Sequence, residues 1–286
     1  MVSCPWSVVG GQLSVVHGPR SLISTDNRQL ATDNRQPTTD NLQLTMTYTY
    51  KALNRAIGKA IHRYDMISDG DRIAVGLSGG KDSLALMWML NERLSRIRIR
   101  YELFAIHIDP GFEGGFSDSL KSCSEKMGYS VRVEHTDYGI QGHSPENREN
   151  PCFLCSRLRR KRLFEIADEL GCTKVALGHH KDDIIETLFL NICYAGEIST
   201  MVPSQSLFQG KFRIIRPLAY ADEDLIRRFA KTQDFPDFVN PCPSAKTSKR
   251  QEIKTLLKQL YRSNRKIKGN IFRAMSHVKP EYLLKP

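Results

Sequence analysis

The chain has 286 residues, of which 40% are hydrophobic, and its formal net charge is +11. This length suggests one large domain with modest additions, and the apolar content is ample for a buried core. No stretch reaches about 18 uncharged apolar residues, so no transmembrane helix is expected. The positive balance indicates a polyanionic partner, with nucleic acid first and an anionic membrane surface second.

The seven cysteines are odd in number and lack the even spacing of secreted disulfide frameworks. The first sixteen residues are mildly apolar, but they have no basic leader and contain the pair Gly10-Gly11. We therefore expect a cytoplasmic protein whose thiols are kept reduced.

Residues 1–45 differ in pattern from the rest of the chain. Seven-residue units begin at Thr25, Thr32 and Thr39 and read TDNRQLA, TDNRQPT and TDNLQLT. They carry polar residues and a proline where a coiled coil needs an apolar seam. Such a segment buries too little surface to offset its ordering entropy, so a disordered leader is predicted. Translated upstream repeat DNA, with Met46 as the natural start, is the other interpretation.

Apolar spacing predicts alternating strands and helices after the leader. Helices are expected over residues 51–65, 84–94, 117–127, 152–170 and 182–194, and strands over 72–77, 103–108, 130–134 and 174–177. A polar stretch over 139–150 predicts a loop. This alternation indicates an α/β domain over residues 46–240, with a doubly wound parallel sheet. Residues 241–286 are predicted to form a basic, helical C-terminal extension.

A glycine-rich loop, Ser78-Gly79-Gly80-Lys81-Asp82-Ser83, joins the first predicted strand to the next helix. A turn in this position places backbone N–H groups and the positive end of a helix dipole around an anion. The loop lacks the GxxxxGK[ST] spacing of a Walker A motif, and it is not GxGxxG. The sequence therefore predicts a phosphate site of another kind.

Two further segments follow strand ends. Asp109 ends the second predicted strand, and Gly178-His179-His180-Lys181-Asp182-Asp183 follows the fourth. Ligands of open parallel sheets bind at the carboxyl ends of strands, so both segments are expected to face one cleft. Asp182 and Asp183 also stand at a helix start, where a capping role is equally compatible with the sequence.

Cys152 and Cys155 form a CxxC motif at the start of a predicted helix, next to several arginines. Both features predict lowered thiol pKa values. Cys242 lies in a turn between two prolines, which suits the presentation of a ligand. Zinc, an Fe–S cluster, a redox pair or no function are all compatible with a lone CxxC, although structural zinc needs four ligands. Core packing is expected for Cys123, Cys172 and Cys193.

Four segments together resemble the TtcA-type tRNA 2-thiocytidine synthetases of the PP-loop ATP pyrophosphatase superfamily, over most of residues 50–286. The segments are YDMISDGDRIAVGLSGGKDS, PCFLCSRLRRKRLFEIADELGCTKVALGHHKDDIIETLFLN, IIRPLAY and the Pro-Cys turn at Cys242. The chain departs from the family pattern after Cys242, where the run PSAKTSKRQ contains no second cysteine. It also lacks the paired zinc-finger cysteines of related 2-thiouridine enzymes.

The resemblance implies ATP and Mg²⁺ at the loop, and an enzyme that adenylates the C2 oxygen of a tRNA cytidine at position 32 before sulfur replaces it. Ser78, Gly79, Gly80 and Ser83 would cradle the pyrophosphate. Lys81, Asp82 and Ser83 are the expected catalytic residues. Asp109, Gly178 and Asp183 would complete the nucleotide site.

The resemblance further implies a 4Fe–4S cluster held by Cys152, Cys155 and Cys242. A cysteine desulfurase or another sulfur donor is expected as a partner. Basic residues are expected to hold the tRNA: Arg157, Arg159, Arg160, Lys249, Arg250, Arg265 and Lys266. A homodimer is left open. The alternatives are another PP-loop tRNA-modifying ligase, of the 2-thiouridine or lysidine type, and a non-catalytic RNA-binding Fe–S protein.

Overall fold

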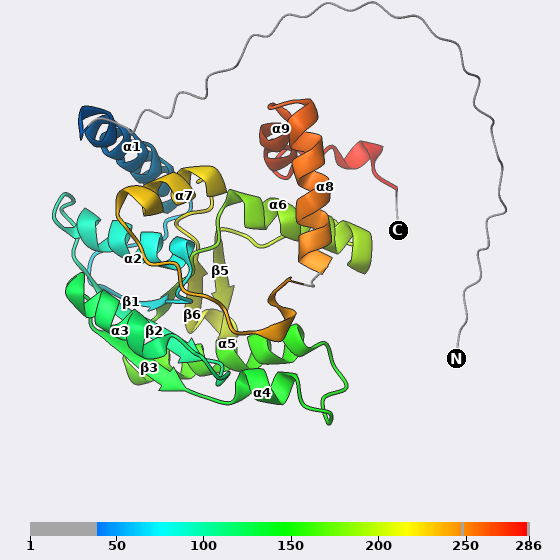
Figure 1. The fold of residues 1–286 in the computed structure, drawn as a ribbon. Helices are drawn as coiled ribbons and strands as arrows, with labels where there is room; N and C mark the ends of the chain where they lie inside the picture. The colour runs from blue at the N-terminus through cyan, green and yellow to red at the C-terminus, as the bar shows by residue number, and fades with distance from the viewer. Residues whose placement is uncertain (1–38, 247–248, 285–286) are drawn as a thin grey trace, which may run out of the picture. The chain divides into compact units, whose positions relative to one another are not determined.

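The computed structural model describes residues 39–246 and 249–284 (Figure 1). They contain a six-stranded sheet with the order β3-β2-β1-β4-β6-β5. The strands are β1 (Asp71–Gly76), β2 (Tyr101–Asp109), β3 (Val131–His135), β4 (Lys174–Ala176), β5 (Ser204–Leu207) and β6 (Phe212–Ile215). Neighbouring strands pair in parallel except β5 and β6, which form an antiparallel hairpin at one edge.

Helices cover the sheet and continue beyond it. They are α1 (Thr39–Arg63), α2 (Lys81–Leu94), α3 (Ser117–Lys126), α4 (Tyr138–Gly142), α5 (Pro151–Glu169), α6 (Lys181–Leu190), α7 (Glu223–Thr232), α8 (Lys249–Ser263) and α9 (Ile267–Ala274). A π-helical segment, Asn191–Ala195, follows α6. None of the helices in the described ranges combines the length and apolarity that crossing a bilayer requires.

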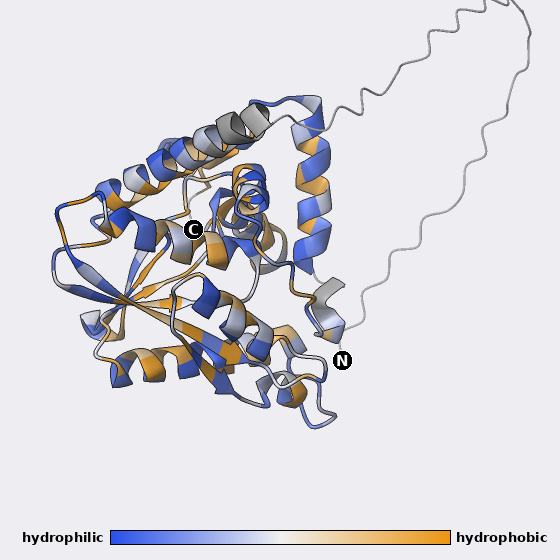
Figure 2. Ribbon diagram, turned by 60° about the vertical axis from the view of Figure 1, so that its left-hand side comes forward, coloured by the Kyte–Doolittle hydropathy of each residue, from blue (hydrophilic) through white to orange (hydrophobic). Residues whose placement is uncertain are grey.

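Alternate residues of the central strand β1 enter two separate cores. Ile73 and Val75 pack in a cluster that includes Phe229 of α7, whereas Ala74 packs with Ile166 of α5. Successive side chains of a strand point to opposite faces, so both faces of β1 are buried under helices. Figure 2 shows apolar residues concentrated on the strands and polar residues on the outer helix surfaces. The predicted doubly wound parallel sheet is confirmed.

The C-terminal extension is helical, as predicted. Ile253 and Leu257 of α8 are buried against Ile185 of α6. Figure 1 shows α8 and α9 side by side next to α6. The basic tail is therefore packed on the α/β domain through a small apolar core of its own.

Two sequence expectations differ from the structure. Helix α1 begins at Thr39, so the leader boundary placed after residue 45 falls inside a helix; residues 1–38 lie outside the described residues. Extending a helix from a packed segment adds a hydrogen bond per residue without a new nucleus. The predicted loop over 139–150 contains α4, because Gly139 donates its N–H to the Pro110 carbonyl at 2.8 Å and thereby anchors a helical turn.

Candidate active site

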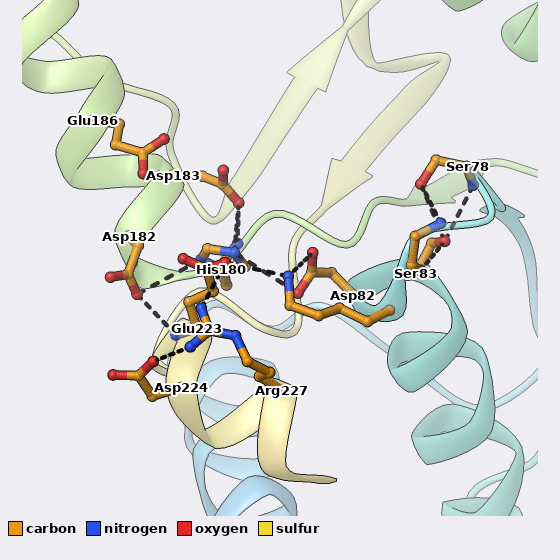
Figure 3. Close-up of polar contacts among 12 residues, drawn as sticks. Ser78, Asp82, Ser83, His180, Asp182, Asp183, Glu186, Glu223, Asp224 and Arg227 are labelled. Carbon is orange, nitrogen blue, oxygen red and sulfur yellow. Dashed lines mark hydrogen bonds and ion pairs between the residues drawn. The ribbon is translucent and has the colours of Figure 1, made fainter. Parts of the chain in front are cut away.

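The phosphate loop is braced by its own side chains (Figure 3). The buried Ser83 hydroxyl donates to the Gly80 carbonyl at 2.9 Å and accepts from the Ser78 N–H at 3.1 Å. Gly79 has φ +79°, and a Cβ there would lie 2.3 Å from the Phe116 ring, so this position requires glycine. Ser83 thus stabilises the conformation of the loop itself.

Helix α2 starts directly after this loop with an open N-terminus. Gly80 is the N-cap, its backbone is extended, and no side chain within the described ranges caps the helix. The first N–H groups of a helix have no intrahelical acceptor, and they bind anions readily. This strand–loop–helix unit has the geometry that a phosphate group needs.

Lys81 and Asp82 belong to an ion-pair cluster whose members on α2, α6 and α7 are drawn in Figure 3. Helix α8 joins this cluster through Arg250 and Lys254. The Lys81 ammonium lies 3.2 Å from Asp82 Oδ2 and 3.3 Å from Glu223 Oε1, and Lys254 contacts Glu223 Oε2 at 3.0 Å. Burial alone would raise the pKa of Glu223, but the two lysines outweigh burial and lower the pKa to about 2. Asp82 Oδ1 is buried without a hydrogen-bond partner in the described structure, so one carboxylate oxygen can accept a cation.

Asp109, at the end of β2, is held in a hydrogen-bonded network. It accepts from the Ser117 hydroxyl at 2.5 Å and from the Gly111 N–H at 2.9 Å. Burial alone would raise the pKa of Asp109, but these two hydrogen bonds outweigh burial and lower it. Ser117 also contacts His107, whose other ring nitrogen lies 2.8 Å from the Leu77 carbonyl. The network therefore joins the carboxylate to the start of the phosphate loop.

The segment after β4 approaches the same loop and caps two helices. A Cβ on Gly178 would lie 3.0 Å from the Ser83 backbone nitrogen, so the glycine permits this close approach. Asp183 Oδ2 accepts from the His180 N–H at 2.9 Å, and Asp182 Oδ2 accepts from the Glu223 N–H at 2.9 Å. Both aspartates therefore accept backbone hydrogen bonds at helix starts, which is the capping role that the sequence offered as an alternative to ligand binding.

A cleft of about 230 Å³ opens beside the carboxyl ends of β1 and β2. It is lined by Ser78, Gly79, Gly80, His107, Asp109, Pro110, Gly115, Phe116, Ser117, Arg159, Phe238, Asn240 and Pro241. The phosphate loop forms one side of this cleft. The elements that carry the CxxC motif and Cys242 reach it from the other side.

Cys152 and Cys242 are presented by the same local turn. Each follows an Asn-Pro pair, and the side-chain oxygen of Asn150 or Asn240 accepts from the backbone N–H of the cysteine at 3.0 Å. Cys155 lies one helical turn beyond Cys152 in α5 and is half-buried. All three thiols are free of disulfides.

The Cys155 thiol is close enough to Cys152 and Cys242 for its pKa to depend on their charges. Burial raises the pKa of the Cys155 thiol, and the charges of Cys242 and Cys152 raise it further, against the opposing effect of Arg159. The expectation of a lowered thiol pKa is therefore wrong for Cys155, because desolvation exceeds the influence of the arginine. Within the described ranges, no three Cys, His, Asp or Glu side chains are arranged to hold a metal ion.

Two tertiary contacts hold the Cys242 segment in this place. The ring of Phe238 stacks on Phe116 with centroids 5.0 Å apart, beside the phosphate loop. The Ser244 hydroxyl lies 2.7 Å from His143 Nε2, just after α4. The segment therefore runs from Phe116, beside the phosphate loop, to His143, which follows the helix α4 that packs on the CxxC helix α5.

The cations expected to hold tRNA fall into three groups. Three of them pair with carboxylates: Arg250 with Glu186, Arg157 with Glu149, and Lys249 with Glu252. Arg159 instead lines the cleft and is half-buried. Arg160, Arg265 and Lys266 are exposed and form no ion pair with any described residue.

The sequence did not single out several residues of the site. His107, Ser117 and Glu223 contact the predicted residues but lie in ordinary helix or strand patterns. The repeated Asn-Pro-Cys triplet, at residues 150–152 and 240–242, was a usable signal for a shared role of two cysteines.

The sheet order and the open strand–loop–helix unit define a PP-loop type of nucleotide-binding domain. A family profile described as "PP-loop domain" matches residues 49–260. The chain is similar to U34-tRNA thiolase NcsA from Methanococcus maripaludis, solved with its [4Fe-4S] cluster. The TM-score is 0.68 at 27% identity, and the likeness covers 84% of this chain and 81% of that one.

Curated relatives refine this class. The tRNA-cytidine(32) 2-sulfurtransferase of Geotalea daltonii is 41% identical over 82% of this chain and 94% of its own length. The enzyme of the same name from Geobacter sulfurreducens is 40% identical, with 82% and 93% covered. The chain therefore belongs to the tRNA-cytidine(32) 2-sulfurtransferase family of PP-loop proteins.

Proposed function

We propose that this protein uses ATP to replace the C2 oxygen of cytidine 32 in tRNA with sulfur. One observation carries the proposal: a single cleft is lined by an open phosphate loop and by parts of the two segments that carry the free cysteines Cys152, Cys155 and Cys242. The family relatives, named for thiolation of that nucleoside, support the choice of substrate.

The loop serves the activation step. The C2 oxygen of the base attacks the α-phosphorus of ATP, and pyrophosphate leaves with the electrons of the broken P–O bond. The open N–H groups of α2 and the Lys81 ammonium would stabilise the negative charge on the phosphates. Sulfide then forms a bond to C2, and the C2–O bond breaks as AMP departs with the oxygen.

Mg²⁺ would be held on the loop side of the cleft. Asp82 supplies a buried carboxylate oxygen that no described side chain hydrogen-bonds. Hard divalent cations prefer such oxygen ligands and neutralise phosphate charge. Asp82 is therefore our candidate ligand for the magnesium of ATP.

Cys152, Cys155 and Cys242 would hold a 4Fe–4S cluster. Their free thiols are the ligand type that such clusters need, and the PP-loop thiolase NcsA was solved with one. A cluster held by three cysteines would leave one iron with a free position, where it would supply a binding site for sulfide. The Asn150 and Asn240 turns orient two of the three ligands before any cluster binds. A reducing cytoplasm would keep these thiols free.

The test is thiolation in vitro with the anaerobically purified, iron-loaded protein. It would receive ATP, Mg²⁺, sulfide and an unmodified tRNA transcript, and mass spectrometry would identify the nucleosides formed. We expect 2-thiocytidine together with AMP. Formation of 2-thiouridine would overturn the assigned nucleoside, and AMP formation without any thionucleoside would favour another PP-loop ligase.

A further inference from the structure

A second and larger hollow lies apart from the cleft. It has a volume of about 730 Å³ and is lined by α1, the start of α6, residues 200–203, Tyr220 and the end of α9. It shares no lining residue with the cleft at the phosphate loop. We refer to this hollow as the α1–α9 groove. Its volume lies in the range of ordinary ligand sites.

The charged side chains that line the groove are all basic. Arg55, Lys59 and Arg63 follow one another at intervals of four residues on α1, so they form a row with steps of about 6 Å. These three and Arg273 of α9 are exposed and form no ion pair with any residue that the structure describes. Lys181, in contrast, is paired with Asp222 at 3.0 Å.

The free cations of the groove differ from those of the C-terminal helices. Arg250, Lys254 and Lys268 also belong to the basic extension, but each lies within 3.2 Å of a carboxylate oxygen. Their charges are therefore matched inside the protein. The row on α1 has no such match and remains available to an external anion.

Aromatic rings form one wall of the same groove. Tyr220 lies between Tyr64 and Phe272, with ring centroids 6.1 and 5.7 Å away. All three rings are half-buried, and the Lys59 ammonium sits 5.0 Å above the Tyr220 ring. Ala52 and Ala56 of α1 also line the groove, and their short side chains leave room beside the row of cations.

We infer that the α1–α9 groove binds an unpaired, single-stranded segment of the tRNA substrate. The row on α1 would contact successive phosphates, and exposed bases would pack on the aromatic wall in place of Lys59, which lies over Tyr220, and Lys181, which lies over Phe272. Proteins recognise single-stranded RNA by this combination of a basic track and aromatic platforms. The inference rests on the proposed function for the identity of the RNA. It adds a second contact region, separate from the nucleotide cleft.

Charge and shape favour RNA over other anionic partners. A membrane surface would bind to a convex basic face, whereas these cations border a hollow with aromatic walls. An acidic peptide would pair with the cations, but it has no bases that could stack on the aromatic rings. Charge and shape therefore favour a nucleotide chain as the occupant of the groove.

The first experiment removes the row of cations. The combined variant Arg55→Ala, Lys59→Ala, Arg63→Ala would be compared with Lys121→Ala, Lys126→Ala, Lys231→Ala, which removes the same charge from exposed sites elsewhere. Binding of a tRNA transcript and of a short single-stranded ribo-oligonucleotide would be measured against salt. Loss of three single-strand contacts should reduce the log–log slope by about 2, whereas the control should keep the wild-type slope.

The size of this effect can be read from two salt concentrations. Between about 50 and 200 mM salt, wild-type affinity should fall roughly 20-fold more than that of the groove variant. An identical slope in wild type and groove variant would overturn the groove. A slope reduced equally by the control variant would do so as well, since it would show a non-specific charge effect. Circular dichroism would confirm that both variants are folded.

A second experiment locates the RNA directly. Ultraviolet cross-linking of the ribo-oligonucleotide, followed by peptide mapping, should modify peptides that contain Tyr220 or Phe272. Cross-links confined to other peptides would overturn the inference. The proposed function is tested separately: binding in the groove without 2-thiocytidine formation would refute the proposed reaction alone, and thiolation with an unaltered tRNA KM in the groove variant would refute the groove alone.

Discussion

On one side of the cleft the phosphate loop runs through consecutive residues, Ser78 to Ser83, and hydrogen-bonds to itself. On the other side the thiols of Cys155 and Cys242 come from distant segments, which only tertiary contacts bring together. The loop has its binding geometry before any ligand arrives, because a strand, a glycine and a helix start determine it locally. The cysteine side depends on contacts between segments, and within the described residues no three Cys, His, Asp or Glu side chains form a metal-binding group.

The largest effect should follow from breaking the cysteine side. Replacing Cys242 by Ala removes one of the three cluster ligands that we propose, so bound iron and 2-thiocytidine formation should both fall to background. ATP binding should persist, because the loop is held by its own contacts. Iron content, the visible absorbance of the cluster and ATP binding would be measured on the same preparation.

Cys123→Ala is the matched control for this change. Its half-buried side chain lies outside the three-cysteine group, so the substitution should cost at most about 1–2 kcal/mol of stability. If Cys242→Ala keeps a full cluster and full thiolation, the three-ligand site is wrong. The CxxC pair would then be better explained as a redox or persulfide pair.

A substitution in the phosphate loop should give the opposite pattern, with AMP formation lost and bound iron retained. Lys81→Ala removes a positive charge that we propose contacts the phosphates, and AMP formation should fall by about 10²–10³-fold. The iron content should be unchanged, because Lys81 contacts Asp82 and Glu223 rather than a thiol. Lys121→Ala, an exposed lysine on α3, provides the control. Normal turnover by the Lys81 variant would show that the loop does not bind the phosphates of ATP as we propose.

The segment after β4, which approaches the loop, should be sensitive to acid. Burial lowers the pKa of His179 from 6.5 to about 4, although Asp183 opposes the shift. The folded state thus binds the proton less tightly than the unfolded state. The corresponding stability is fully present above pH 6.5 and is lost as the pH falls through the window to about 4. The loss should approach about 3 kcal/mol.

The measurement is the free energy of unfolding of wild type and His179→Asn across that window. The asparagine variant should show a flatter dependence on pH, since it has no titrating group at this position. Parallel curves for the two proteins would show that another group controls acid stability.

The smallest expected effect concerns Asn240, whose side chain orients Cys242. Asn240→Ala removes the turn hydrogen bond to the Cys242 N–H, which is worth about 1 kcal/mol. Iron retention should weaken about 5-fold, while ATP binding stays the same. Asn264 makes the same kind of turn contact, to the Lys266 N–H at 2.8 Å, far from the cysteines. Equal iron loss in Asn240→Ala and Asn264→Ala would refute an orienting role for Asn240.

Sequence alone determined the features that depend on short-range periodicity. The strand before Ser78, the glycine at position 79 and the helix after it predicted the phosphate loop, because each has its own backbone preference. The edge hairpin β5–β6 was not predicted, since its strands are short and β5 is half-exposed. The CxxC helix and the basic helical tail were also visible, although the tail's charges did not reveal which of them were free.

Only the tertiary structure decided how those pieces are used. It placed Arg159 in the cleft, paired Arg250 with Glu186 and Lys254 with Glu223, and left the row at Arg55, Lys59 and Arg63 unpaired within the described residues. It also raised the pKa of Cys155, which the helix start and arginines alone would lower. Burial and ion pairing depend on which segments meet in space, and that information is spread over the whole chain.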